Sequence, residues 1–133
     1  MRQPTTTVNP LRALSDRGQS VWLDNISRGL ITGGQLQRLI DEDGISGITS
    51  NPTIFPKAIA ESSVYDESLK RIVRDQPGIS NACLAECLMI EDIQLAAERL
   101  RPTFDRTQGA DGFVSLEVSP KCAGNTEATV AEA

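Results

Sequence analysis

The segment ISGITSNP, residues 45–52, decides how this chain folds. It is short and mostly apolar, and Pro52 cannot continue a central strand, so the segment predicts a buried strand that stops in a turn. A similar segment, SVWLDNI, precedes it at residues 20–26, and a third, GFVSLEVSP, follows at residues 112–120. Such nearly continuous apolar runs are typical of strands in parallel sheets.

Helical patterns fill the chain between and around these three strands. Thr32 is expected to cap a helix that Gly44 terminates, and Pro102 is expected to lie just past the end of the longest helix. In all, we expect helices over residues 11–18, 32–44, 53–62, 64–74 and 81–100, and one that starts at Asn125. This alternation predicts an α/β fold with right-handed parallel crossovers, either an open doubly wound sheet or a barrel.

Length and charge limit the kinds of partner. The chain has 133 residues, a length that suits one domain, and we expect a flexible arm over residues 1–10 before a folded part over residues 11–133. Its net charge of -5 and pI of about 4.7 argue against nucleic acid or an anionic membrane surface as partner. No apolar run has the length of a membrane-spanning helix and no secretory signal is recognised, so a cytoplasmic location is expected.

The cysteines and the missing histidine restrict the chemistry. Three cysteines, an odd number, fit a reducing compartment better than a disulfide framework. Cys83 and Cys87 would share a helix face and allow a metal site completed by Cys122 and a carboxylate, but buried apolar thiols are the commoner case and we expect no metal. Without any histidine, chemistry depends on carboxylates, lysine or hydroxyls.

Polar side chains lie within or at the end of each predicted strand, toward the edge where α/β folds place their active sites. These side chains are Asp24, then Thr49, Ser50 and Asn51, then Ser115 and Glu117. They cap the following helices, simply face solvent, or converge on one polar pocket, and their recurrence on three successive strands favours the pocket. The Gly33-Gly34 pair lacks the spacing of a dinucleotide-binding loop.

The stretch GITSNPTIF, residues 47–55, resembles the transaldolase signature. The flanking stretches SVWLDNISRGLITGGQLQRLIDEDGI, residues 20–45, and DGFVSLEVSP, residues 111–120, are similar to transaldolases in the same order. The resemblance covers most of residues 9–133 and is strongest to the long bacterial transaldolases, some of which are fused to an isomerase. It implies a (β/α)8 TIM barrel of the aldolase class, here truncated to about three strands and their helices.

The resemblance also implies an activity and roles for particular residues. Transaldolases transfer a dihydroxyacetone unit between sedoheptulose 7-phosphate and glyceraldehyde 3-phosphate in the pentose phosphate pathway, through a lysine Schiff base and without a metal or organic cofactor. Asp24 matches the aspartate that transfers a proton at the substrate hydroxyl, and Glu117 matches the glutamate that works with a catalytic water. Thr49 and Asn51 match residues that hold substrate hydroxyls, and Ser115 matches a hydroxyl near that glutamate.

The chain departs from the family pattern at the lysine. The Schiff-base lysine of transaldolases lies on the fourth strand, and this sequence has only Lys57, Lys70 and Lys121, of which none matches it. We therefore expect the chain to be inactive alone. Because an unclosed barrel leaves open sheet edges, we also expect self-association or a partly ordered state.

Two other functions remain open at this point. The chain is a non-catalytic module that binds sugar phosphates or serves assembly, or it is an unrelated small α/β enzyme that uses Asp24 and Glu117 as an acid/base pair.

Overall fold

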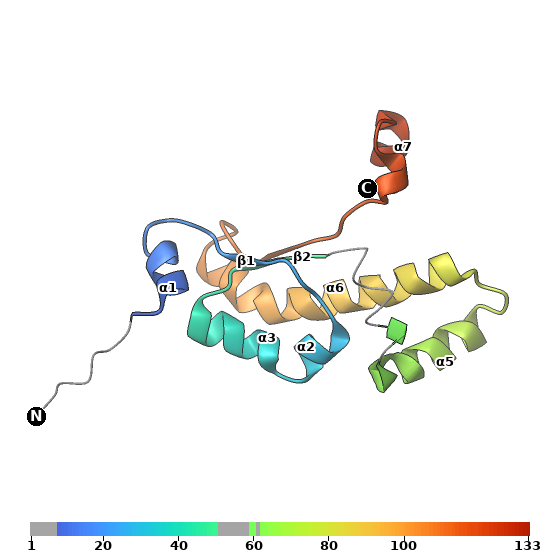
Figure 1. Ribbon diagram of the computed structural model, residues 1–133, viewed down its shortest axis with the longest axis horizontal. Coiled ribbons are helices and arrows are strands. Elements are labelled where there is room, and N and C mark those ends of the chain that lie inside the picture. The colour runs from blue at the N-terminus through green and yellow to red at the C-terminus, as the bar shows by residue number, and fades with distance from the viewer. Residues whose placement is uncertain (1–7, 51–58, 61) are drawn as a thin grey trace, which may run out of the picture.

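A computed structural model describes residues 8–50, 59–60 and 62–133 of the chain (Figure 1). Its sheet contains β1 (Trp22–Leu23), β2 (Gly47–Thr49) and β3 (Phe113–Ser115), in the order β1-β2-β3 and all parallel. The predicted parallel α/β arrangement is confirmed. Only two or three residues of each predicted strand are paired, and within the described ranges the sheet is open and does not close into a barrel.

The first helix, α1 (Pro10–Ser15), starts one residue before the expected boundary between the arm and the folded part. Asn9 caps it, because the Asn9 side-chain oxygen accepts hydrogen bonds from the backbone of Leu11 and Arg12. The Asn9 amide also donates to the Asp43 carboxylate at 2.6 Å, which ties the start of α1 to the segment before β2.

The region between β1 and β2 differs from the prediction. It contains α2 (Arg28–Thr32), α3 (Gln35–Arg38) and a π-helical turn over Leu39–Asp43. The prediction that Thr32 caps a helix was wrong: Ser27 caps α2, and the Thr32 hydroxyl donates to the Arg28 carbonyl at 2.8 Å inside that helix. Gly44, with a φ of 75°, ends the π-helical turn as predicted, because glycine adopts this left-handed conformation without a steric cost.

The helices after β2 are a short 3-10 turn η2 (Ser63–Tyr65), α5 (Asp66–Asp75) and α6 (Asn81–Arg106). Most of the helix predicted over residues 53–62 lies outside the described residues, although Ile59 and Ala60 are helical. The prediction that the longest helix ends before Pro102 was wrong, since Pro102 lies inside α6. Proline removes one backbone hydrogen bond, but buried Leu100 and Thr103 anchor the helix on either side, so it continues.

The core lies between the sheet and the helix layer formed by α2, α3, α5 and α6, which Figure 1 shows on one side of the strands. Alternate strand residues point to this layer, and Leu23, Ile48 and Val114 pack in the core. The other strand residues, which point away from this layer, include Trp22 and Gly47. A Cβ atom at position 47 would lie 2.3 Å from the Trp22 ring. Glycine at position 47 therefore lets the indole lie against β2.

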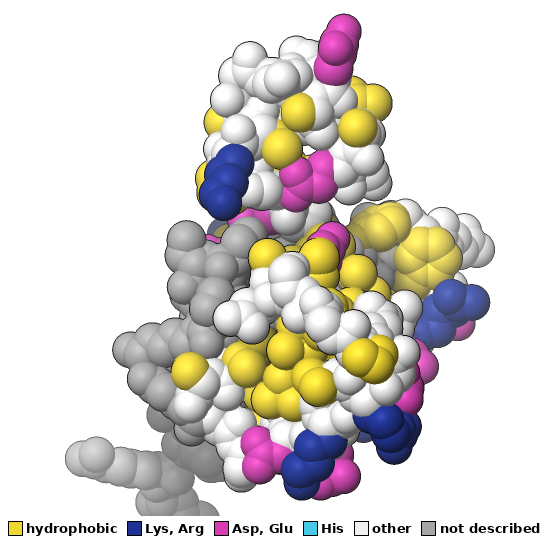
Figure 2. All heavy atoms as spheres, turned by 90° about the vertical axis from the view of Figure 1, so that its right-hand side faces the viewer, with side chains coloured by type: hydrophobic (Ala, Val, Ile, Leu, Met, Phe, Trp, Pro, Cys, Tyr) yellow, Lys and Arg dark blue, Asp and Glu magenta, His cyan; other side chains and the backbone are white. Residues whose placement is uncertain are grey.

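The C-terminal segment stands apart from this body. After β3 come the 3-10 turn η3 (Pro120–Cys122) and α7 (Thr126–Glu132), which Asn125 caps as predicted. In Figure 1 and in the space-filling view of Figure 2, this segment projects from the rest of the molecule, and α7 packs on η3. In the parts of the chain that the structure describes, the helices are too short or too polar to cross a bilayer.

Candidate functional site

The carboxyl ends of the three strands bring three of the predicted site residues together. Thr49 and Ser115 are register partners on β2 and β3, and Asp24 directly follows β1, the other neighbour of β2. The Thr49 hydroxyl donates a hydrogen bond to the Asp24 carboxylate at 2.5 Å. Asp24 is nonetheless exposed, so this carboxylate remains accessible to a ligand or a water molecule.

Glu117 reaches the same edge through Ser50, which the sequence analysis placed at a strand end but to which it assigned no role. The Ser50 backbone N–H donates to the Ser115 carbonyl at 3.0 Å, and the Glu117 backbone N–H donates to the Ser50 hydroxyl oxygen at 3.0 Å. Ser50 is fully buried, with 0% of its surface exposed. Its position, one residue after Thr49 and therefore on the opposite side of the strand, was the signal that could have identified it.

The predicted convergence of residues 24, 51 and 117 is seen only in part. The Glu117 side chain is exposed and lines a shallow hollow with Glu86, Met89 and Glu132, whereas Asp24 does not border this hollow. Asn51 lies outside the described residues. The structure thus places Asp24, Thr49 and Ser115 side by side, with Glu117 two residues beyond the end of β3.

The described lysines lie in solvent. The Lys70 ammonium donates to the Glu67 carboxylate at 2.8 Å, and this hydrogen bond and the charge of Glu67 raise the pKa of Lys70. A raised pKa keeps the amine protonated and makes it a poor nucleophile. Lys121 is exposed in η3, and Lys57 lies outside the described residues.

The cysteines are less buried than expected. Cys83 is exposed, which contradicts the expectation of a buried thiol, and Cys87 and Cys122 are half-buried. The Cys122 thiol donates to the Glu132 carboxylate at 2.8 Å, and this hydrogen bond raises the pKa of the thiol. Among the residues that the structure describes, no three cysteine, aspartate or glutamate side chains are grouped as metal ligands would be.

A large open hollow lies at the opposite edge of the sheet. It is bordered by Ser20, Ser46 and Asp111, each of which precedes a strand, and by the side chains of Arg12 and Arg106. In parallel α/β folds this amino-terminal edge contributes to stability, whereas chemistry takes place at the carboxyl ends. The hollow is therefore not the candidate site.

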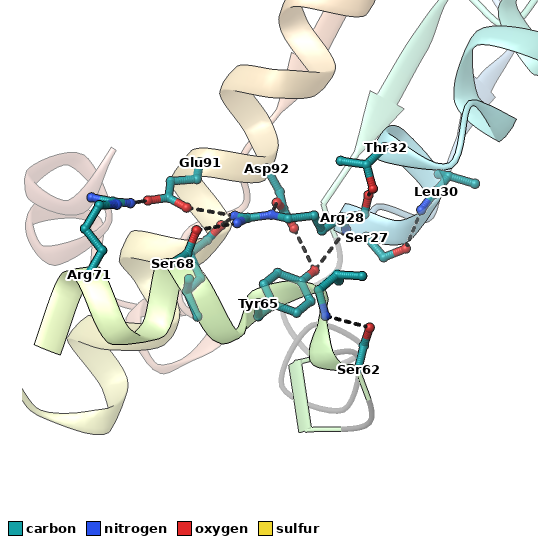
Figure 3. Close-up of polar contacts among 12 residues, drawn as sticks. Ser27, Arg28, Leu30, Thr32, Ser62, Tyr65, Ser68, Arg71, Glu91 and Asp92 are labelled. Carbon is teal, nitrogen blue, oxygen red and sulfur yellow. Dashed lines mark hydrogen bonds and ion pairs between the residues drawn. The ribbon is translucent and has the colours of Figure 1, made fainter.

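A buried ionic network joins the helices behind the sheet (Figure 3). Arg28 on α2 donates from Nε to Asp92 Oδ1 at 2.6 Å, and the Tyr65 hydroxyl donates to Asp92 Oδ2 at 2.7 Å. The Arg28 backbone N–H donates to the Tyr65 hydroxyl oxygen at 2.9 Å. Burial raises the pKa of Tyr65 strongly, because the charged phenolate would be poorly solvated there.

The same arginine extends the network to α5 and the adjacent turn of α6. Its Nη1 donates to the Ser68 hydroxyl at 2.6 Å, and its Nη2 donates to the Glu91 carboxylate at 2.9 Å. Arg71 forms a further ion pair with Glu91. Because these groups bond to one another across three helices, the network fixes how the helices pack; nothing in the one-dimensional pattern had indicated it.

Comparison with known proteins identifies the family. A family model described as transaldolase/fructose-6-phosphate aldolase matches residues 21–133. The transaldolase of Thermobifida fusca (strain YX) is 48% identical over 126 residues, which cover 94% of this chain and 33% of that protein. The transaldolase of Thiobacillus denitrificans is 46% identical over 126 residues, 95% of this chain and 34% of that protein. Transaldolase 2 of Nostoc sp. (strain PCC 7120) is 43% identical over 126 residues, 95% of this chain and 32% of that protein.

The chain thus spans about a third of the length of these curated relatives. The resemblance noted for residues 47–55 lies inside the matched region, and the three parallel strands lie inside it as well. On these grounds the chain belongs to the transaldolase/fructose-6-phosphate aldolase family.

Proposed function

We propose that this chain provides the first three strands of a transaldolase active site, part of a (β/α)8 barrel. The reaction would transfer a dihydroxyacetone unit between sedoheptulose 7-phosphate and glyceraldehyde 3-phosphate, as a step of the pentose phosphate pathway in the cytoplasm. The family match supports this proposal, and so does the position of the polar residues at the carboxyl ends of parallel strands.

The chemistry assigns a task to each residue at this edge. A lysine amine adds to the ketose carbonyl, and the carbinolamine loses water to give a Schiff base. Asp24 then accepts the proton of the substrate hydroxyl, the adjacent carbon–carbon bond breaks, and the electron pair moves into the imine. Glu117 acts through a water molecule in forming and hydrolysing the Schiff base, while Thr49, Asn51 and Ser115 hold substrate hydroxyls.

One observation supports this assignment most directly. Asp24 is exposed at the carboxyl end of β1 and accepts a 2.5 Å hydrogen bond from Thr49 on the neighbouring strand. The carboxylate is thus oriented by the sheet while its other oxygen stays available to substrate.

The lysine must come from elsewhere in the proposed enzyme. Lys70 and Lys121 are exposed and lie off the strands. We assign the Schiff-base lysine to the region that corresponds to the unmatched two-thirds of the relatives, and we expect the 133-residue chain to be inactive alone.

Borohydride trapping tests the proposal. The chain alone, and the chain joined to the remaining part of the Thermobifida fusca transaldolase, are incubated with sedoheptulose 7-phosphate and borohydride, and adducts are located by mass spectrometry. We expect no adduct on the chain alone and one lysine adduct, with turnover in a coupled assay, on the joined protein.

Other outcomes would replace the proposal. If the joined protein is folded but forms no adduct, the transaldolase assignment is wrong. An adduct at Lys121 of the chain alone would show an active fragment. If calorimetry detects sugar-phosphate binding without turnover by either protein, the chain is a binding module.

A further inference from the structure

We propose that Ser50 is a positioning residue, which holds Glu117 at the carboxyl edge of the sheet by accepting a hydrogen bond from its backbone. This inference rests on the proposed function for its catalytic consequence, but not for its geometry. The two residues are 67 positions apart in the sequence and meet only because β2 and β3 are neighbours.

The bonding of Ser50 is specific. Because side chains alternate along a strand, Ser50 points to the same side as Ile48, toward the core, and it is fully buried. A buried hydroxyl is costly unless it is hydrogen-bonded. The Ser50 hydroxyl oxygen accepts from the Glu117 N–H at 3.0 Å, and the Ser50 N–H donates to the Ser115 carbonyl at 3.0 Å.

This pair of bonds continues the alignment of the two strands beyond the paired residues. The last register pair of the sheet is Thr49 with Ser115, and Leu116 after it is exposed and offers no packing anchor. The Glu117 side chain is exposed beyond the last strand pair, where it borders the hollow with Glu86 and Met89, and the bond to Ser50 fixes the backbone from which it extends. Loss of the Ser50 hydroxyl would leave the backbone of this segment without that support.

Amide hydrogen exchange measured by NMR on the 133-residue chain tests the geometry. In Ser50→Ala, the Glu117 amide should exchange at least about fivefold faster than in the original chain, whereas Ser50→Thr, which keeps the hydroxyl, should change it less than about twofold. The reference is the Gly112 amide, which donates to the Ser46 carbonyl at 2.8 Å at the other end of the same strand pair. Unchanged Glu117 exchange in Ser50→Ala would overturn the proposal.

A second variant is needed if Ser50→Ala destabilises the whole chain. If Ser50→Ala speeds exchange at Gly112 as well, Ser50→Cys is used instead, because it has nearly the same shape but sulfur is a weak acceptor. Faster exchange at Glu117 with unchanged exchange at Gly112 supports the proposal. Equal exchange at Glu117 in Ser50→Cys and the original chain overturns it.

Kinetics of the joined protein test the catalytic consequence. We expect Ser50→Ala to lower kcat by about tenfold or more with KM within about twofold, and Ser50→Thr to restore kcat, because misplacement of a catalytic group affects the transition state. An unchanged kcat in Ser50→Ala overturns the positioning role. Failure of the joined protein with Ser50 intact to form the borohydride adduct instead refutes the proposed function, and the exchange result then still decides the geometry.

Discussion

The helix layer and the carboxyl edge of the sheet use charged side chains in opposite ways. In the helix layer, Arg28 and Asp92 are buried, and the Arg28 guanidinium and the Asp92 carboxylate are hydrogen-bonded to each other and to neighbouring residues. At the strand ends, Asp24 and Glu117 are exposed, and Asp24 accepts a side-chain hydrogen bond from Thr49. The difference separates groups that fix the packing from groups that remain able to act on a ligand.

The energetics of burial explain this division. A charge removed from water must be paired and hydrogen-bonded, so removing one partner of a buried pair has a large effect. An exposed carboxylate keeps its hydration and contributes little to stability. Variants in the buried network should therefore lose stability, whereas variants at the strand ends should keep their stability and lose activity.

The largest effect on stability is expected for Asp92→Asn. This change removes the buried carboxylate that pairs with Arg28 Nε, while Glu91 stays paired with Nη2, so the free energy of unfolding should fall by about 3 kcal/mol, the lower end for broken buried pairs. Urea denaturation followed by circular dichroism measures the loss.

Asp105→Asn is the matched control for that variant. Asp105 lies on the same helix and forms an exposed pair with Arg101 at 3.4 Å, so its loss should not measurably change the unfolding midpoint. Equal midpoints for the two variants would show that the network of Arg28 does not stabilise the helix layer.

A smaller effect on stability is expected at alkaline pH, where Tyr65 ionises. Burial first, and then the neighbouring Asp92, raise its pKa in the folded state above the unfolded value of about 10. The resulting stability is fully present below pH 10 and is lost as the pH rises through the folded-state pKa. Tyr65 is the single tyrosine, so the absorbance of tyrosinate reports it alone.

The titration compares the folded chain with the chain in urea. We expect tyrosinate to form at higher pH in the folded chain than in urea. Coincident titration curves would contradict the buried position of the phenol. The comparison needs no substitution, because urea supplies the unfolded reference.

The smallest effect on stability, and the largest on activity, is expected for Asp24→Asn. The free energy of unfolding should change by no more than about 0.5 kcal/mol, because Asp24 is exposed. In the joined protein, however, kcat should fall by at least about a hundredfold, since the amide cannot accept the substrate proton. Turnover within a factor of two of the original would exclude Asp24 as the proton acceptor.

The order of elements was predictable from sequence where local rules are strong. Apolar runs located the three strands that the structure describes, Gly44 marked the end of a helical segment, and Asn125 marked the start of another. The proximity of Asp24 and Thr49 followed from one rule, that parallel strands carry their carboxyl ends at one edge.

Features that depend on tertiary packing were not predictable. Asp92 has the appearance of a polar position on an amphipathic helix, and nothing local links it to Arg28, 64 residues earlier. Pro102 gave the wrong helix end, because buried neighbours outweigh one missing backbone bond. Ser50 was noticed at the end of a strand, but its bond to Glu117 requires the register of β2 and β3.

The indole of Trp22, which lies against Gly47, gives the molecule an intrinsic optical reporter. Trp22 is the single tryptophan of the chain and is 38% exposed. A polypeptide that settles on this side of the sheet would exclude water from the ring and shift its fluorescence emission to shorter wavelength. Assembly of the proposed enzyme from separate pieces could thus be followed in real time without an attached dye.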